Sequence, residues 1–214
     1  ARKVGFQNIN VDLIFGIPGQ TFESWKNTID GVLQFADPEH ISVYSLTIEE
    51  GTNFYKDGIV VDDDLSADMY RLSIEYLKKS GYHHYEISNF CRPGRQCQHN
   101  LNYWYNGDYL GLGLGAVSYI NGKRIKNTEN LIDYLNRKFQ LDFEELNSAK
   151  KMAEDLMLGL RLIDGIIVSD AIKERFSTKI NNLIDDGLLQ QQNSFLKLTD
   201  TGVMFANRVF REFL

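Results

Sequence analysis

The pattern that most limits the fold is a strand, a helix and a second strand near the start of the sequence. The apolar run 9–17 (INVDLIFGI), bounded by Gly16 and Pro18, is typical of a buried parallel strand. Residues of helical periodicity follow, and Asp37 ends them ahead of a second strand at 41–46 (ISVYSL). Such a unit requires parallel strands and a right-handed crossover. We therefore predict an α/β fold whose ligands gather at the carboxyl ends of its strands.

A carboxylate interrupts the first of these strands. Asp12 stands inside the apolar run, where an uncompensated charge is costly, so it is expected to have a partner or a ligand. The alternative is an Asp that bonds to neighbouring backbone. After the strand, Thr21 and Ser24 are predicted to cap the helix.

The stretch 85–118 concentrates reactive and aromatic residues. Its two cysteines, Cys91 and Cys97, form a C-x5-C pair, which is a weak metal signal because structural zinc sites use closer pairs and four ligands. The glycines at 111, 113 and 115 alternate, so a strand would present all three on one face for a close approach. Their spacing does not match a dinucleotide-binding motif.

The segment HNLNYW is the most informative part of this stretch. A histidine followed by amide and aromatic side chains, here His99, Asn100, Tyr103 and Trp104, can ligate haem iron or stack on a flat conjugated ligand. The alternative is a buried histidine hydrogen-bonded to backbone, with Tyr103 and Trp104 as core anchors.

Further elements are predicted on both sides of this stretch. His83 and His84 are expected to be exposed or half-buried residues of a short strand. The tail has the order of a winged helix. Its predicted elements are helices at 127–137, 148–162, 168–176 and 179–186, a hairpin at 190–198 and a helix capped by Thr199. Ahead of the tail, a helix is predicted within 65–79 and a strand at 82–89. The segment 178–186 carries one lysine against two aspartates, which is poor for binding phosphates, so the tail is interpreted as structural or protein-facing.

The composition and net charge argue against some classes of protein. The net charge of −6 argues against a general nucleic-acid binder. Two cysteines and no leader peptide or long apolar run predict a cytoplasmic protein without a membrane span. Residues 1–6 resemble the last turn of a helix closed by Gly5, and we therefore expect a fragment of a longer protein.

Four segments together resemble a known family. The segments 10–21 (NVDLIFGIPGQT), 85–90 (YEISNF), 99–104 (HNLNYW) and 111–118 (GLGLGAVS) are similar to the oxygen-independent coproporphyrinogen III oxidase-like radical SAM proteins. The likeness is greatest to the branch of haem chaperones called HemW. It covers essentially the whole chain.

The resemblance implies a fold and a set of domains. It implies an α/β chain that holds the late strands and helices of a partial radical SAM (β/α) barrel, followed by an α-rich winged-helix-like domain. Residues 1–60 would belong to the barrel, residues 61–140 would form a connecting α/β region with the HNxxYW motif, and residues 141–214 would form the C-terminal domain.

The resemblance also implies cofactors and site residues. Full-length members carry a [4Fe-4S] cluster and S-adenosylmethionine, which Asp12 would contact. His99, Asn100, Tyr103 and Trp104 match the motif associated with haem binding, with His99 as the ligand of the iron. The family's C-x3-C-x2-C motif has no counterpart here, so this chain alone is not expected to assemble the cluster or to run radical chemistry.

Three functions follow as hypotheses. The first is a haem chaperone that delivers haem to a recipient protein. The second is the oxidase itself, which decarboxylates porphyrinogen propionates, and the third is a winged-helix DNA-binding regulator, which the acidic segment 178–186 disfavours.

An exposed sheet edge of a half-barrel would need cover from a partner chain, a domain swap or a structural rearrangement. The sequence therefore leaves dimerisation open.

Overall fold

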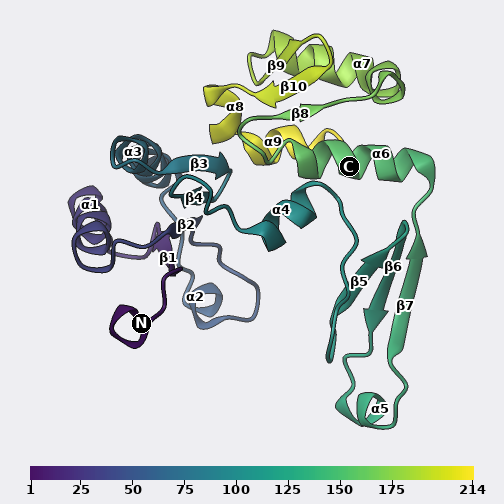
Figure 1. Cartoon of the computed structure of the whole chain (residues 1–214), viewed down its shortest axis with the longest axis horizontal. Helices are drawn as coiled ribbons and strands as arrows, with labels where there is room; N and C mark the ends of the chain where they lie inside the picture. The colour runs from purple at the N-terminus through teal and green to yellow at the C-terminus, as the bar shows by residue number, and fades with distance from the viewer. The chain divides into compact units, whose positions relative to one another are not determined.

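The structure is a computed structural model that describes residues 1–139 and 142–214 with their side chains, and residues 140 and 141 by backbone alone. The chain divides into two compact units, residues 1–97 and residues 98–214. In Figure 1 the first unit runs from purple to teal and the second from teal to yellow. Each unit is described by itself. The division into 1–60, 61–140 and 141–214 stays a prediction.

The first unit is built on a four-stranded sheet in the order β1-β2-β4-β3. Strands β1 and β2 are parallel, with Asn10 opposite His40, so the predicted strand–helix–strand unit is confirmed, and β4 and β3 are antiparallel. Its elements are η1 (Arg2–Val4), β1 (Asn10–Phe15), α1 (Phe22–Gly31), the π-helical turn η2 (Val32–Ala36), β2 (His40–Ser45), α2 (Asn53–Lys56), α3 (Asp63–Lys79), β3 (His83–Glu86) and β4 (Asn89–Cys91).

Helices α1 and α3 lie on one face of this sheet (Figure 1). The core between them holds apolar side chains that alternate along the strands, such as Leu13 and Ile41, and the fully buried Trp25 of α1. The indole Nε1 of Trp25 donates to the carbonyl of Met69 at 3.1 Å and so fixes α1 against α3. The capping box of Thr21 and Ser24 that the sequence predicted begins α1.

Two predictions for the first unit need correction. The single strand expected at 82–89 is a hairpin of β3 and β4, because the chain turns back at Ile87 and Ser88. His84 was expected to be exposed or half-buried, yet it is buried and its ring stacks on Phe90 at 4.3 Å. The glycine cap at Gly5 is confirmed, with φ at 99°.

The second unit begins with α4 and a three-stranded antiparallel sheet in the order β5-β6-β7. The elements are α4 (Gln98–Trp104), β5 (Val117–Ile120), β6 (Lys123–Asn127), α5 (Leu131–Leu135) and β7 (Gln140–Glu145). The sequence predicted a helix at 127–137 but not this sheet. In Figure 1, α5 lies at one end of the sheet.

The remainder of the second unit has the helix and strand order of a winged helix. Its small sheet has the order β8-β10-β9, and α7 packs against β9. The elements are α6 (Ser148–Gly159), β8 (Ile166–Ile167), α7 (Asp170–Asp185), β9 (Leu189–Gln192), β10 (Phe195–Leu198), α8 (Asp200–Met204) and α9 (Ala206–Arg211). The predicted turn is present, with Asn193 at a φ of 56°, and Thr199 caps α8 as expected.

One prediction for this part is wrong. The helices expected at 168–176 and 179–186 form the single helix α7. Its buried residues Ile172, Phe176, Ile180 and Leu183 continue one apolar stripe across the expected break. Among the described residues, no helix is both long and apolar enough to cross a membrane.

Candidate functional site

The HNLNYW segment forms helix α4, and its side chains divide between two faces. His99 and Tyr103 are four residues apart and meet edge to face, with ring centroids 4.8 Å apart. The His99 side chain is exposed, which rules out the alternative of a buried histidine. Asn100 and Trp104 are also four residues apart, on a neighbouring face, and both are half-buried.

Aromatic rings continue from His99 within the second unit. Tyr103 contacts Tyr109 with centroids 4.7 Å apart, and Tyr109 lies 6.1 Å from Tyr119 of β5. These rings line a cavity of about 310 Å³, which we call the aromatic cavity. The other lining residues are Trp104, Asn106, Gly107, Arg124, Glu154, Met157 and Leu158. A flat, apolar ligand beside His99 would find ring faces and edges to pack on here.

Trp104 separates this cavity from a second one. The Arg161 guanidinium lies over the Trp104 ring at 4.3 Å and also over Phe210 at 5.5 Å. The second cavity, which we call the arginine cavity, measures about 410 Å³. It is lined by Trp104, Met157, Leu158, Arg161, Asn207, Phe210, Arg211 and Leu214. The two cavities therefore share Trp104, Met157 and Leu158 as a common wall.

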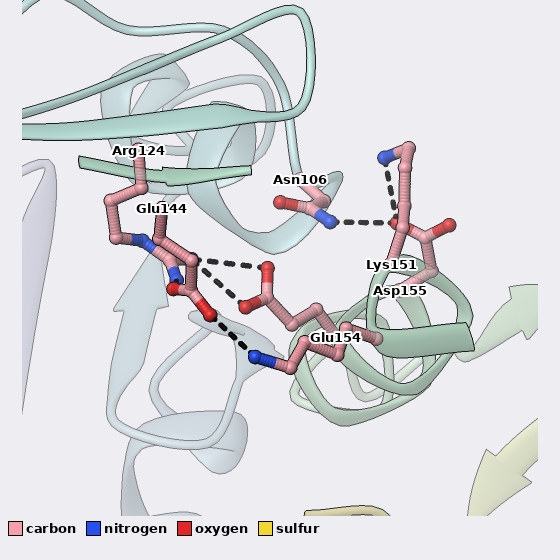
Figure 2. A network of polar contacts seen from close by, with 7 residues as sticks. Asn106, Arg124, Glu144, Lys151, Glu154 and Asp155 are labelled. Atoms are coloured by element: carbon pink, nitrogen blue, oxygen red, sulfur yellow. Dashed lines mark hydrogen bonds and ion pairs between the residues drawn. The ribbon is translucent and has the colours of Figure 1, made fainter. Parts of the chain in front are cut away.

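Ion pairs fix the wall of the aromatic cavity to α6 (Figure 2). Arg124 of β6 donates to Glu144 of β7 at 3.0 Å and to Glu154 of α6 at 2.9 Å, and Lys150 donates to Glu144 at 2.8 Å. Partial burial disfavours the charged Arg124, but its hydrogen bond and attraction to Glu154 outweigh that effect and raise its pKa.

A second set of contacts anchors the loop after α4 to the same helix. Figure 2 shows Asn106 donating to Asp155 of α6 at 2.7 Å, while Lys151 donates to the same carboxylate at 3.2 Å. Together with the Arg124 pairs, these contacts hold β6, β7 and this loop on α6. The cavity wall is thus tied to several elements rather than to one loop.

The glycine segment lies beside these elements but is not a strand. Residues 111–116 form a loop, in which Gly113 has a φ of 110° and Gly115 a φ of 68°. Positive φ angles are incompatible with the extended strand that the alternation predicted. The expected close approach occurs at Gly111, where an added Cβ would lie 2.3 Å from the carbonyl oxygen of Val117.

In the first unit, Asp12 lies on the sheet face opposite α1 and α3. It is exposed rather than buried, because β1 is an edge strand and the described helices pack on its other face. Its carboxylate accepts a hydrogen bond from Asn10 Nδ2 at 2.7 Å. The sequence predicted a partner or ligand for Asp12, and Asn10 is such a partner.

A chain of hydrogen bonds extends from Asp12 to β3. The Asn10 amide oxygen accepts from Nδ1 of the buried His40 at 2.7 Å. His40 Nε2 then accepts from the Tyr85 hydroxyl at 2.9 Å, and this hydroxyl accepts from the backbone N–H of Cys97 at 3.3 Å. These directions follow from Asp12, since an ionised carboxylate only accepts. Burial lowers the pKa of His40, while the Asp12 charge opposes that shift, so the neutral ring fits the chain.

The sequence analysis missed His40. A signal for it was present, because a parallel register that aligns the starts of β1 and β2 sets position 40 opposite position 10. Its neighbour Asn10 had been noted only as part of a family segment. The register, not the residue type, was the missing information.

The two cysteines were a weak metal signal in the sequence. Cys91 is buried, which raises its pKa to about 11, and Cys97 is half-buried. Over residues with described side chains, no three His, Cys, Asp or Glu residues lie close enough to hold a metal ion together. Haem iron is a different case, because the porphyrin supplies most of its ligands and the protein adds an axial one.

The chain is similar to known proteins both in sequence and in structure. Residues 146–205 match the family described as HemN C-terminal domain. The structure is similar to that of coproporphyrinogen III oxidase (HemN) from Escherichia coli, which is a radical SAM enzyme. The TM-score is 0.79 at 20% identity, over 99% of this chain and 56% of that chain. The expected α/β fold class is thereby confirmed.

In sequence, the chain is also similar to proteins named heme chaperone HemW. The Lactococcus lactis protein is 35% identical over 228 residues, which cover 100% of this chain and 60% of that protein. The Bacillus subtilis protein is 36% identical, with 100% and 61% covered. The protein of Synechocystis is 43% identical over 176 residues, or 77% of this chain and 42% of that protein. The chain thus spans about three fifths of the length of the first two relatives.

Proposed function

We propose that this chain is the haem-binding portion of a haem chaperone that transfers haem to a recipient protein. The names of its relatives support this proposal. The observation that carries it is the position of His99, exposed on α4 with its ring against Tyr103 and the aromatic cavity nearby. Haem would be cargo here, bound and released rather than retained.

The residues present fit haem. An exposed imidazole can ligate the iron through one ring nitrogen, while the Tyr103 contact restricts the ring's orientation. Tyr103, Tyr109 and Trp104 present aromatic surface for the porphyrin. Asn100 follows His99 on α4 and is a candidate polar contact for the bound ligand. An exposed site also suits a protein that must release its ligand to another protein.

Of the two radical SAM cofactors, S-adenosylmethionine fits the described residues and the [4Fe-4S] cluster does not. S-adenosylmethionine in the full-length protein would meet the helix-free sheet face, where the Asp12 carboxylate can accept from its ammonium group and Asn10 and His40 hold Asp12 in place. The [4Fe-4S] cluster does not fit the described residues, because Cys91 and Cys97 are the two cysteines of the sequence and lie in no three-ligand group. No step through the cluster is assigned to this chain.

The test is a haem titration followed by absorbance. The chain is expected to shift the Soret band of added haem at micromolar concentration, and His99→Ala is expected to weaken binding at least tenfold. His83→Ala is a matched control, since His83 is also an exposed histidine. Equal binding by all three proteins would refute His99 as the ligand, and no binding by the unaltered chain would refute the proposal for this portion.

The oxidase remains the second candidate because the fold resembles that of HemN. It predicts that the full-length protein decarboxylates coproporphyrinogen III in the presence of S-adenosylmethionine. Absence of product, together with transfer of bound haem to an apo-haem protein, would favour the chaperone. Product formation at an enzymatic rate would favour the oxidase.

A further inference from the structure

A series of aromatic rings joins His99 to the interior of the second unit. The His99 ring meets Tyr103 at an interplanar angle of 84°, and Tyr103 meets Tyr109 at 61°, with centroids 4.8 Å and 4.7 Å apart. Exposure falls along the series, since His99 is exposed, Tyr103 and Tyr109 are half-buried, and Tyr119 is 2% exposed. Tyr109 is therefore the ring that connects the pair on α4 to the buried part of the unit.

Tyr109 itself is fixed through its backbone. It forms an antiparallel bridge with Tyr119 of β5, in which the backbone N–H of each residue donates to the carbonyl of the other, at 2.7 Å and 2.9 Å. Its ring also lies 6.1 Å from the Tyr119 ring. The position of Tyr109 is therefore set by β5 as well as by its own loop.

The loop after α4 brings Tyr109 back to the helix. Asn106 has a φ of 52°, in the left-handed region that Asn adopts more readily than most residues. The Gly107 N–H donates to the Asn102 carbonyl at 2.8 Å, and the Asn102 side-chain amide donates to the Asp108 carbonyl at 3.0 Å. An added Cβ at Gly107 would lie 2.4 Å from Asn102 Oδ1, so a larger residue would displace the Asn102 side chain. The return of the chain toward Tyr109 is thus built into the local sequence.

We propose that Tyr109 is a positioning residue for the histidine that ligates haem. It holds the Tyr103 ring, and the Tyr103 ring in turn sets the orientation of the His99 imidazole. An imidazole already held in one orientation loses less freedom when it binds iron, and contacts that orient a metal-binding histidine raise its affinity for the metal. This inference rests on the proposed function and deepens it, because it assigns a role in haem binding to a residue outside the HNxxYW motif.

The first experiment records electron paramagnetic resonance of the cyanide complex of the ferric, haem-loaded chain, because its g values depend on the orientation of the axial imidazole. Tyr109→Leu removes the ring and is expected to shift or broaden the g values and to weaken haem binding about three- to tenfold. Tyr109→Phe keeps the ring and is expected to give the spectrum of the unaltered chain. Tyr105→Leu is the matched control, since Tyr105 is exposed and, within the described part of the chain, takes part in no ring contact.

The second experiment needs no haem. Nuclear magnetic resonance of the haem-free chain records the His99 ring protons, which are assigned with His99→Ala and whose chemical shifts depend on the ring current of Tyr103. Tyr109→Leu is expected to move these shifts toward those of an unstructured peptide, whereas Tyr109→Phe and Tyr105→Leu are expected to leave them unchanged. If Tyr109→Leu does not fold, Tyr109→Met, whose flexible side chain fills irregular space, takes its place.

The outcomes separate this inference from the proposed function. Either unchanged g values or unchanged His99 shifts in Tyr109→Leu would overturn the inference while leaving the proposed function intact. Equal changes in Tyr109→Leu and Tyr109→Phe would assign the effect to the hydroxyl group rather than to the ring, and would overturn it as well. If the unaltered chain binds no haem, the proposed function fails, and the His99 shifts of the haem-free variants still decide whether Tyr109 orients His99.

Discussion

At the scale of single residues, the side chains of the HNxxYW motif divide between two positions in the structure. His99 contacts Tyr103, which lines the aromatic cavity, whereas Trp104 lines both cavities. The motif could be recognised from the sequence, but this division could not. It depends on Arg161, which is 57 positions after Trp104 and reaches its ring only in the folded chain.

Two substitutions of Trp104 test its role. Within the described part of the chain, its buried indole Nε1 has no hydrogen-bond partner, so Trp104→Phe loses no such bond and keeps an aromatic face for Arg161. We expect it to change the free energy of unfolding by no more than about 1 kcal/mol. Trp104→Ala removes the ring and is expected to cost about 2 kcal/mol or more. Urea unfolding measures the free energy of unfolding of both variants. A loss in Trp104→Phe as large as the loss in Trp104→Ala would show that the indole N–H is hydrogen-bonded.

His84 makes the first unit sensitive to acid. Burial lowers its pKa from 6.5 to about 4, although hydrogen bonding to the backbone of Ile87 opposes the shift. Because the unfolded state then binds the proton more readily, stability is full above pH 6.5 and falls as the pH drops toward 4. The expected loss between pH 7 and pH 5 is about 2 kcal/mol.

The matched variants are His84→Gln and His83→Gln. Denaturant unfolding at pH 7 and pH 5 should show a smaller pH-dependent loss in His84→Gln, whereas His83→Gln, altered at the exposed neighbour, should keep the loss of the unaltered chain. The same pH dependence in both variants would assign it to other groups, of which the buried His40 is the first.

At the scale of elements, the sequence alone was sufficient to predict where a helix or turn begins, wherever a single capping or turn residue determines the local backbone conformation. Thr21 and Ser24 begin α1, Asn193 turns the β9–β10 hairpin, and Thr199 begins α8, all as predicted. The break expected within α7 was wrong. Ser177 and Thr178 are weak helix formers, but the apolar stripe of Phe176 and Ile180 spans them, and packing outweighs propensity.

A proline at position 177 distinguishes one helix from two. Within a continuous α7, Ser177→Pro removes a backbone hydrogen bond and clashes with the preceding turn, so we expect a loss of about 3 kcal/mol or more. Proline at the start of a second helix would be tolerated. Ser177→Ala, the control, should be neutral or slightly stabilising. Thermal unfolding followed by circular dichroism measures all three proteins, and a tolerated proline would contradict the single helix.

The sheet β5-β6-β7 was missed although one local signal for it exists. Asn121 and Gly122 join β5 and β6 with φ angles of 51° and 76°, as in the two-residue hairpin turns that favour Asn-Gly. The strand after this turn, KRIKN, is rich in charge and does not look like a buried strand. Its Arg124 is stabilised by Glu144 and Glu154, which are distant in sequence. Such pairing requires tertiary information.

At the scale of the whole molecule, the fold class could be predicted because the strand–helix–strand pattern and the winged-helix order are both local. The hydrogen-bonded residues on the polar face of the first sheet could not be predicted from the sequence. They come from three strands and meet only through the strand register, and they are Asp12, Asn10, His40 and Tyr85. Each unit thus carries one candidate site. The S-adenosylmethionine contact is proposed for the first unit and haem for the second.

The central claim is that His99 ligates haem iron, and a ligand exchange tests it most directly. Haem-loaded chain and haem-loaded His99→Cys are compared by absorbance and electron paramagnetic resonance in the ferric state. Thiolate and imidazole give different iron spectra, so the account predicts a histidine-type spectrum for the chain and a thiolate-type spectrum for the variant. Identical spectra for the two proteins would show that the iron is bound elsewhere and would contradict the account.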